Sequence, residues 1–117
     1  MKVSRFIVNP FGVNTYVIWE PDSHEAAIID PGMTDIAELN AVDSFIEREH
    51  LSIRHLINTH MHLDHIFGNL YIKDKYGIDI AAHQADEFLG LTLSEQTRRF
   101  HIPVHVTDHG PDILLKD

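Results

Sequence analysis

The segment His60-Met61-His62-Leu63-Asp64-His65 lies between a predicted strand and a predicted helix. A strand that leads into a helix through this segment is the feature from which we predict the fold. The strand is predicted over Ile53–Thr59, where apolar residues are frequent. After the segment, apolar residues recur at helical spacing from Ile66 as far as Gly77. The sequence therefore predicts a strand-to-helix turn that carries three histidines and one aspartate.

The spacing inside this turn is suited to metal binding. His60 and His62 are two residues apart at a strand end, so their side chains point to the same side and can share one metal ion. Asp64 and His65 begin the next helix and can face a second ion close to the first. Imidazole and carboxylate ligands without sulfur suit zinc, iron or manganese, and zinc in an open site would supply hydroxide at neutral pH. The alternative is that these histidines are surface or helix-capping residues.

The residues before the turn predict an antiparallel start to the sheet. Strands are predicted over Lys2–Val8, Val13–Trp19 and Glu25–Asp30, with turn residues between them. A helix is then predicted from an N-cap at Thr34 to about His50. Its apolar stripe, which should pack on the sheet, consists of Ile36, Leu39, Val42, Phe45 and Ile46.

After the turn, strands and helices alternate. We expect strands over Ile78–Ala82 and Pro103–Thr107, a helix over residues 84–89 and a helical stretch over residues 94–101. This order indicates a layered α/β sandwich, with functional loops at the carboxyl ends of the strands.

Length and composition predict one domain, residues 1–117, which is soluble and by default cytoplasmic. No apolar run approaches the roughly 20 residues that cross a bilayer, so a membrane is not an expected partner. The net charge of −9 disfavours nucleic acid. The chain has no cysteine, so a metal must be held by imidazole and carboxylate groups.

The run from Thr59 to His65, followed by Gly68-Asn69, resembles the metal signature of the metallo-β-lactamase superfamily. Asn14-Thr15-Tyr16 and Ile28-Ile29-Asp30-Pro31-Gly32 are similar to the corresponding segments of glyoxalase II hydrolases. The resemblance covers essentially the whole chain. It implies an αββα sandwich, of which this chain looks like the amino-terminal αβ half, with a mostly antiparallel sheet and flanking helices.

The resemblance also implies roles for individual residues. His60 and His62 would bind a first zinc, and Asp64 and His65 a second, with two ions in a complete site. Asp64 would in addition orient the nucleophile or receive its proton. Asp30 would steady the site without touching the metal, as carboxylates beside metal-bound histidines do, although it could also be a plain turn residue. Because His62 stands where di-iron oxygen-reducing relatives have Glu, the resemblance favours a zinc hydrolase.

The resemblance implies glyoxalase II-like hydrolysis of a small acyl thioester or ester. A small-ester or lactone hydrolase is the nearest alternative, and a phosphodiester hydrolase of the same superfamily is a further one. Members of the superfamily are about twice as long, and their further ligands are not found in this sequence. A second hypothesis is therefore a non-catalytic metal-binding fragment. The same reasoning predicts that the chain pairs with its missing half or with a second copy of itself, since an apolar sheet face would otherwise be exposed.

Four histidines outside the turn have open roles. His101, His105 and His109 recur every four residues and are either substitute metal ligands or solvated, locally hydrogen-bonded side chains. His83 is predicted at a strand end, as a helix N-cap or a substrate contact.

Overall fold

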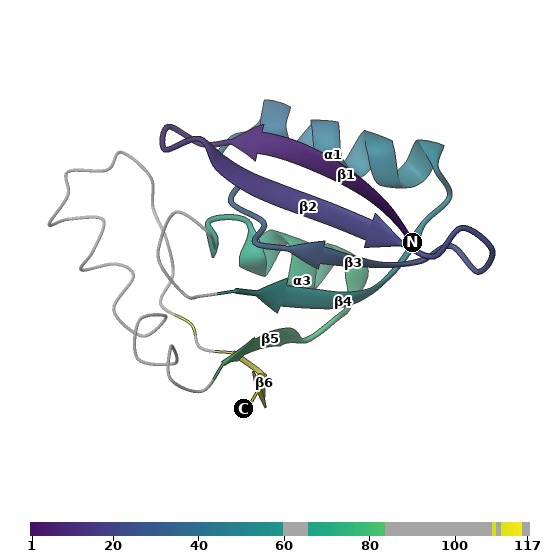
Figure 1. Ribbon diagram of the computed structural model, residues 1–117. Coiled ribbons are helices and arrows are strands. Elements are labelled where there is room, and N and C mark those ends of the chain that lie inside the picture. The colour runs from purple at the N-terminus through teal and green to yellow at the C-terminus, as the bar shows by residue number, and fades with distance from the viewer. Residues whose placement is uncertain (60–65, 84–108, 110, 116–117) are drawn as a thin grey trace, which may run out of the picture.

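The computed structural model describes residues 1–59, 66–83, 109 and 111–115. It confirms the predicted α/β class, with helices packed on one mixed sheet (Figure 1). The elements, in chain order, are β1 (Lys2–Val8), β2 (Val13–Trp19), β3 (Glu25–Ile29), α1 (Ile36–Arg48), β4 (Ser52–Asn58), α3 (Asn69–Tyr76), β5 (Ile80–His83) and β6 (Ile113–Leu115). No described helix is long and apolar enough to cross a membrane.

The strands are arranged in the sheet in their sequence order. β1, β2 and β3 form the predicted antiparallel meander, whereas β4, β5 and β6 are each added in parallel. The expectation of a mostly antiparallel sheet is therefore wrong for the second half of the described sheet. For β4 and β5 the reason is that α1 and α3 carry the chain back along the sheet before each strand, and such crossovers produce parallel neighbours.

The start of α1 differs from the prediction by one residue. Asp35, not Thr34, is the N-cap, and its Oδ1 accepts a hydrogen bond from the Glu38 backbone N–H at 2.8 Å. Thr34 instead binds the Glu38 carboxylate through its own N–H and hydroxyl, at 2.9 and 3.0 Å. Ile36 is consequently the first helical residue and is 75% exposed, so its predicted place in the packed stripe is also wrong.

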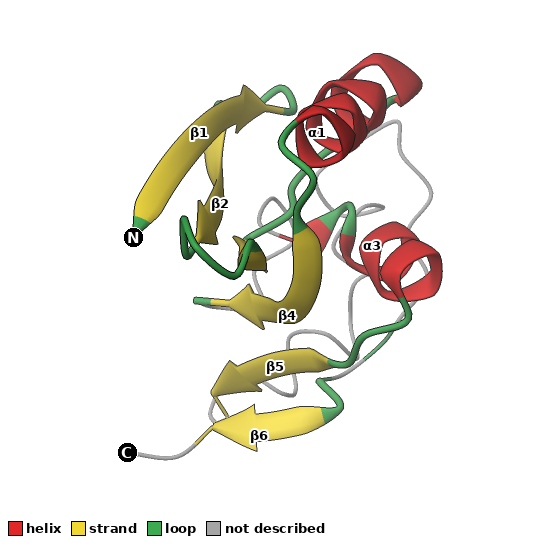
Figure 2. Ribbon diagram, turned by 90° about the vertical axis from the view of Figure 1, so that its right-hand side faces the viewer, coloured by secondary structure: helices red, strands yellow, loops and turns green. Residues whose placement is uncertain are grey.

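Both described helices cover the same face of the sheet, which we call the helix-covered face (Figure 2). Val42 and Ile46 of α1 pack there against alternate residues of the central strands, such as Val17 and Ile28. Leu39 and Phe45 lie at the margin of this core, and the Phe45 ring makes edge-on contacts with Phe6 and Trp19 at centroid distances of 5.5 and 5.4 Å. The predicted amphipathic stripe is thus confirmed from Leu39 onward.

The opposite face of the sheet carries no described helix, and we call it the uncovered face (Figures 1 and 2). Side chains alternate along a strand, so the register assigns a second set of residues to this face. Several are large and apolar, and some are widely exposed, including Ile7 at 66% and Val3 at 60%. The set includes Val3, Ile7, Tyr16, Ile18, Ala27, Ile29, Ile57, Ala81 and Ile113.

The carboxylate of Asp43 links α1 to α3 through hydrogen bonds and an ion pair. Asp43 of α1 accepts hydrogen bonds from the hydroxyls of Tyr71 and Tyr76 at 2.5 and 2.7 Å, and its Oδ2 lies 2.8 Å from the Lys75 ammonium. Partial burial is the largest single influence and raises the pKa of Asp43, but the hydrogen bonds from Lys75 and the two tyrosines together lower it below its ordinary value. The charged form of Asp43 is therefore favoured by folding.

This lowered pKa predicts acid sensitivity. The unfolded chain binds a proton at Asp43 more readily than the folded chain, so the contribution of this group is present above the ordinary pKa of 3.8 and is lost as pH falls below it. We expect Asp43→Asn to weaken the dependence of the unfolding free energy on pH below about pH 4. Urea titrations at several pH values measure this, and an unchanged pH slope in the variant would contradict it.

The carboxyl-terminal part of the described chain contains a strand that was not predicted. β6 is anchored by Asp112, whose Oδ2 accepts from the Ile80 N–H at 2.8 Å and from the Lys73 ammonium at 2.6 Å. The Asp112 N–H also donates to the Ile80 carbonyl at 2.7 Å. The helices predicted over residues 84–89 and 94–101 and the strand predicted over Pro103–Thr107 lie outside the described residues.

Candidate metal centre

The predicted metal-binding turn follows β4 directly. β3, β4 and β5 are parallel, so their carboxyl ends lie at the same edge of the sheet (Figure 1). The predicted ligands His60, His62, Asp64 and His65 lie outside the described residues, so their roles, including the catalytic role of Asp64, stay predictions. Among the residues that are described, no three His, Asp or Glu side chains form a metal-binding group. The structure instead shows how both ends of the turn are held.

Asp30 binds the residue that precedes the first histidine. Its carboxylate is buried, with the residue 5% exposed, and accepts from the Thr59 N–H at 2.8 Å and from the Thr59 hydroxyl at 2.5 Å. The backbone of Asp30 has a φ of +53°, a conformation that aspartate tolerates better than most residues. The end of β3 is thereby fixed to the start of the metal-binding turn. The structure places Asp30 next to this turn, and its action on a metal stays a prediction.

The backbone of Asp30 is held in turn by Thr15. This threonine is fully buried in β2, and its hydroxyl donates to the Asp30 carbonyl at 2.7 Å and accepts from the Gly32 N–H at 3.1 Å. Sequence reasoning gave Thr15 no role. The signal that was available is its position in β2, where a polar residue occupies the buried face between Val13 and Val17.

Gly68 anchors the far end of the turn. Its N–H donates to the Pro31 carbonyl at 2.6 Å, so the residues after β3 contact both ends of the metal-binding turn. A Cβ atom at position 68 would lie 2.8 Å from the same carbonyl oxygen. Only glycine allows this approach of the two backbones.

We therefore expect Gly68→Ala to lower the unfolding free energy by about 1–3 kcal/mol, since the Pro31 carbonyl must move to make room. Gly77→Ala is the matched control. Gly77 has open space around its Cβ position but a φ of +64°, so its replacement should cost about 1 kcal/mol through backbone strain alone. Chemical denaturation compares the two variants, and a smaller effect at position 68 than at position 77 would contradict the steric explanation.

A further contact that was not predicted joins the residues on either side of the turn. Asn58 at the end of β4 and Asn69 at the start of α3 are buried and exchange side-chain amide hydrogen bonds of 3.0 and 2.8 Å. The Asn69 amide nitrogen also lies 3.2 Å from Nε2 of His109. Of the histidines with open roles, His109 contacts Asn69, which is distant in the sequence, and its role as a metal ligand stays open. His101 and His105 lie outside the described residues, and His83 ends β5.

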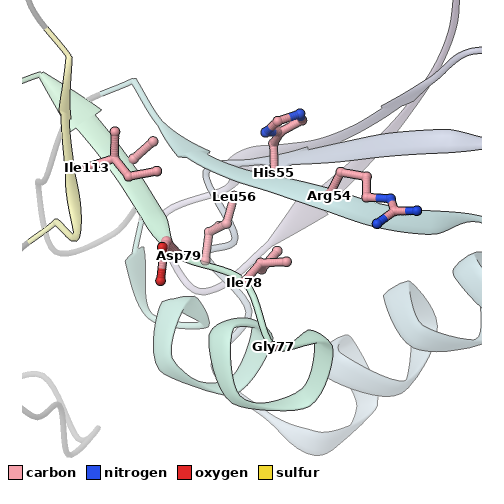
Figure 3. Close-up of a pocket in the computed structure, with 8 residues that line it drawn as sticks. Arg54, His55, Leu56, Gly77, Ile78, Asp79 and Ile113 are labelled. Carbon is pink, nitrogen blue, oxygen red and sulfur yellow. The ribbon is translucent and has the colours of Figure 1, made fainter.

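A shallow hollow between β4 and β5 offers no comparable site. It lies near the start of β5 and is lined by Arg54, His55, Leu56, Gly77, Ile78, Asp79, Ala81 and Ile113. Figure 3 shows that Arg54, His55 and Asp79 point in different directions. The polar side chains do not converge on a common ligand position, and we assign no function to this hollow.

Comparison with known proteins decides the family. Residues 8–117 match the family model described as the metallo-beta-lactamase superfamily. The chain belongs to this superfamily. Its membership implies divalent metal ions, and the imidazole and carboxylate groups of the turn are suitable donors for them.

Curated relatives of this metallo-β-lactamase superfamily chain include hydroxyacylglutathione hydrolases. It is 36% identical over 104 residues to hydroxyacylglutathione hydrolase GloC of Haemophilus influenzae, covering 88% of this chain and 47% of the relative. It is 27% identical over 108 residues to the hydroxyacylglutathione hydrolase of Pelagibacter ubique, covering 81% and 43%. The chain therefore spans about half the length of these relatives.

Solved structures agree on the fold. The crystal structure of the BLEG-1 B3 metallo-beta-lactamase superposes with a TM-score of 0.82 at 26% identity, covering 99% of this chain and 54% of that one. The crystal structure of TTHA1623 in a di-iron-bound form gives a TM-score of 0.76 at 18% identity, covering 97% and 54%. At the latter level of identity the similarity concerns the fold alone.

Proposed function

We propose that this chain contributes the first metal-binding turn of a metal-dependent hydrolase that cleaves small acyl thioesters of the glutathione type. The observation that carries the proposal is the buried Asp30 carboxylate, which binds the residue directly before His60. Two curated relatives named as hydroxyacylglutathione hydrolases support the choice of substrate class.

Four side chains of the turn would hold the metals. His60 and His62 would hold one ion, Asp64 and His65 would hold the other, and zinc is the proposed metal, with iron or manganese as alternatives. When bound, the ions lower the pKa of a water molecule and stabilise negative charge on the acyl oxygen. Asp64 also orients the attacking water and receives its proton. The described contacts of Asp30 and Gly68 hold the two ends of the turn.

The ligand set of the turn is small for two ions. Four side chains give each ion two protein ligands, whereas zinc sites normally have three or more. We infer that a complete site uses ligands from another polypeptide segment, and that the chain alone binds metal weakly. The competing proposal is that the chain alone binds metal without catalysis.

The uncovered face of the sheet supports the need for a partner. It presents exposed apolar residues, among them Val3, Ile7 and Ile113, and single domains seldom leave such a face in water. We propose that a second sheet packs on it, supplied either by a polypeptide with the remaining ligands or by a second copy of the chain. Light scattering after size-exclusion chromatography tests this, and a monodisperse monomer at high concentration would contradict self-pairing.

Metal content and turnover, measured on the same preparation, test the proposed activity. Zinc per chain is determined by elemental analysis, and hydrolysis is followed with an acyl-glutathione thioester, a lactone and a phosphodiester. Two zinc ions per chain with thioester turnover would support a hydrolase that is active alone. Bound zinc without turnover of any substrate would support the non-catalytic alternative, and no bound zinc even with the ion in large excess would reject the metal site.

A further inference from the structure

Asn58 and Asn69 form a buried amide pair across the base of the metal-binding turn. Asn58 ends β4, Asn69 begins α3, and residues 59–68 lie between them. The two residues are 1% and 0% exposed, and each amide donates one hydrogen bond to the other, at 3.0 and 2.8 Å. The pair therefore fixes the separation of the two ends of the turn.

His109 is the third member of this group. The Asn69 amide nitrogen has two hydrogens, one of which is donated to Asn58, and the same nitrogen lies 3.2 Å from Nε2 of His109. An amide nitrogen only donates, so Nε2 of His109 must accept. This contact joins the turn to a residue 40 positions further along the chain.

Such a pair is a poor source of stability. A hydrogen bond between buried neutral groups contributes only about 1 kcal/mol net, and replacing both partners by apolar side chains of similar shape can be nearly neutral. What the pair contributes is a fixed orientation. Hydrogen bonds between two amides require one relative geometry of the two side chains, whereas two packed leucine side chains tolerate several. A buried amide pair at this location is therefore suited to holding a loop in one conformation.

We propose that Asn69 is a positioning residue of the metal centre: with Asn58 it sets the conformation of the metal-binding turn, and with His109 it links that turn to the segment after residue 108. This inference rests on the proposed function, because it assumes that the turn binds metal. It does not depend on which substrate is hydrolysed.

Cobalt titration of the full chain tests the inference. Co²⁺ binding is followed by visible absorption for the unmodified chain, Asn58→Leu/Asn69→Leu, and the control Asn40→Leu, which changes an exposed residue of α1. We expect the double variant to melt within a few degrees of the unmodified chain without metal but to bind Co²⁺ about 10–100-fold more weakly. Equal Co²⁺ affinity in a folded double variant would overturn the proposal.

Two further measurements do not need metal. Hydrogen exchange of the amides of residues 59–68 should accelerate in the double variant while core strands stay protected, and unchanged exchange would count against positioning. In the unmodified chain, the Asn69 side-chain amide and the His109 ring should show a through-space NMR contact, and its absence would overturn the link even if the double variant does not fold. Failure of the unmodified chain to bind Co²⁺ would instead reject the proposed function.

Discussion

His60→Ala is expected to weaken metal binding by about a hundredfold or more. The proposed first ion has only two protein ligands from the turn, so removing one leaves a single imidazole. Loss of a group that merely supports a ligand already costs about 10–100-fold in affinity, and loss of a ligand should cost at least as much. Competition with a chromophoric chelator measures the affinity.

His55→Ala is the matched control for this substitution. His55 is an exposed histidine of β4, the strand that precedes the turn, and it lies on the uncovered face. It should leave metal affinity unchanged, and it corrects for unspecific binding by surface imidazoles. If His60→Ala and His55→Ala bound metal equally well, the turn would not be the metal site.

Asp30→Ala is expected to lower the unfolding free energy by about 3 kcal/mol or more. The substitution removes two hydrogen bonds to a buried carboxylate and leaves the Thr59 N–H without this acceptor. Hydrogen bonds to charged groups contribute about 1.5–3 kcal/mol each. Alanine would also have to adopt a φ of +53°, which is unfavourable for a residue with a Cβ atom.

At the same position, Asp30→Asn keeps the shape of the side chain but removes its charge. Asparagine tolerates the left-handed conformation, its oxygen can accept from the Thr59 N–H, and its nitrogen can donate to the Thr59 hydroxyl. We expect a loss of about 1 kcal/mol, well below that of Asp30→Ala. Urea unfolding compares the two variants. Equal losses would show that the hydrogen bonds to Thr59 contribute little to the fold.

Local sequence patterns were sufficient for most of the described strands. β1 and β2 have the predicted bounds, because alternation and the turn residues after each strand are both local signals. β6 could not be found in this way, since it has three residues and depends on Asp112, whose partners Lys73 and Ile80 are more than 30 positions away. The start of α1 was uncertain for a local reason: Thr34 and Asp35 are both good capping residues.

The candidate site likewise has some features that are local in the sequence and others that depend on contacts between distant residues. The spacing of His60, His62, Asp64 and His65 is a local pattern and could be interpreted from sequence. The contacts of Asn58 with Asn69 and of Gly68 with Pro31 arise only when β4, α3 and the end of β3 are packed together. No pairwise spacing in the sequence marks them, so their roles required the structure.

The hydrogen bonds between Asp30 and Thr59 have a consequence for the order of folding. They join residues 29 positions apart, and they form only after β3 and β4 have paired in parallel, which is a slow, non-local event. The metal should therefore bind late in folding, after β3 and β4 have paired. A peptide that spans only β4 and α3 has the four ligand residues but lacks Asp30 and Pro31, and should bind metal more weakly than the full chain.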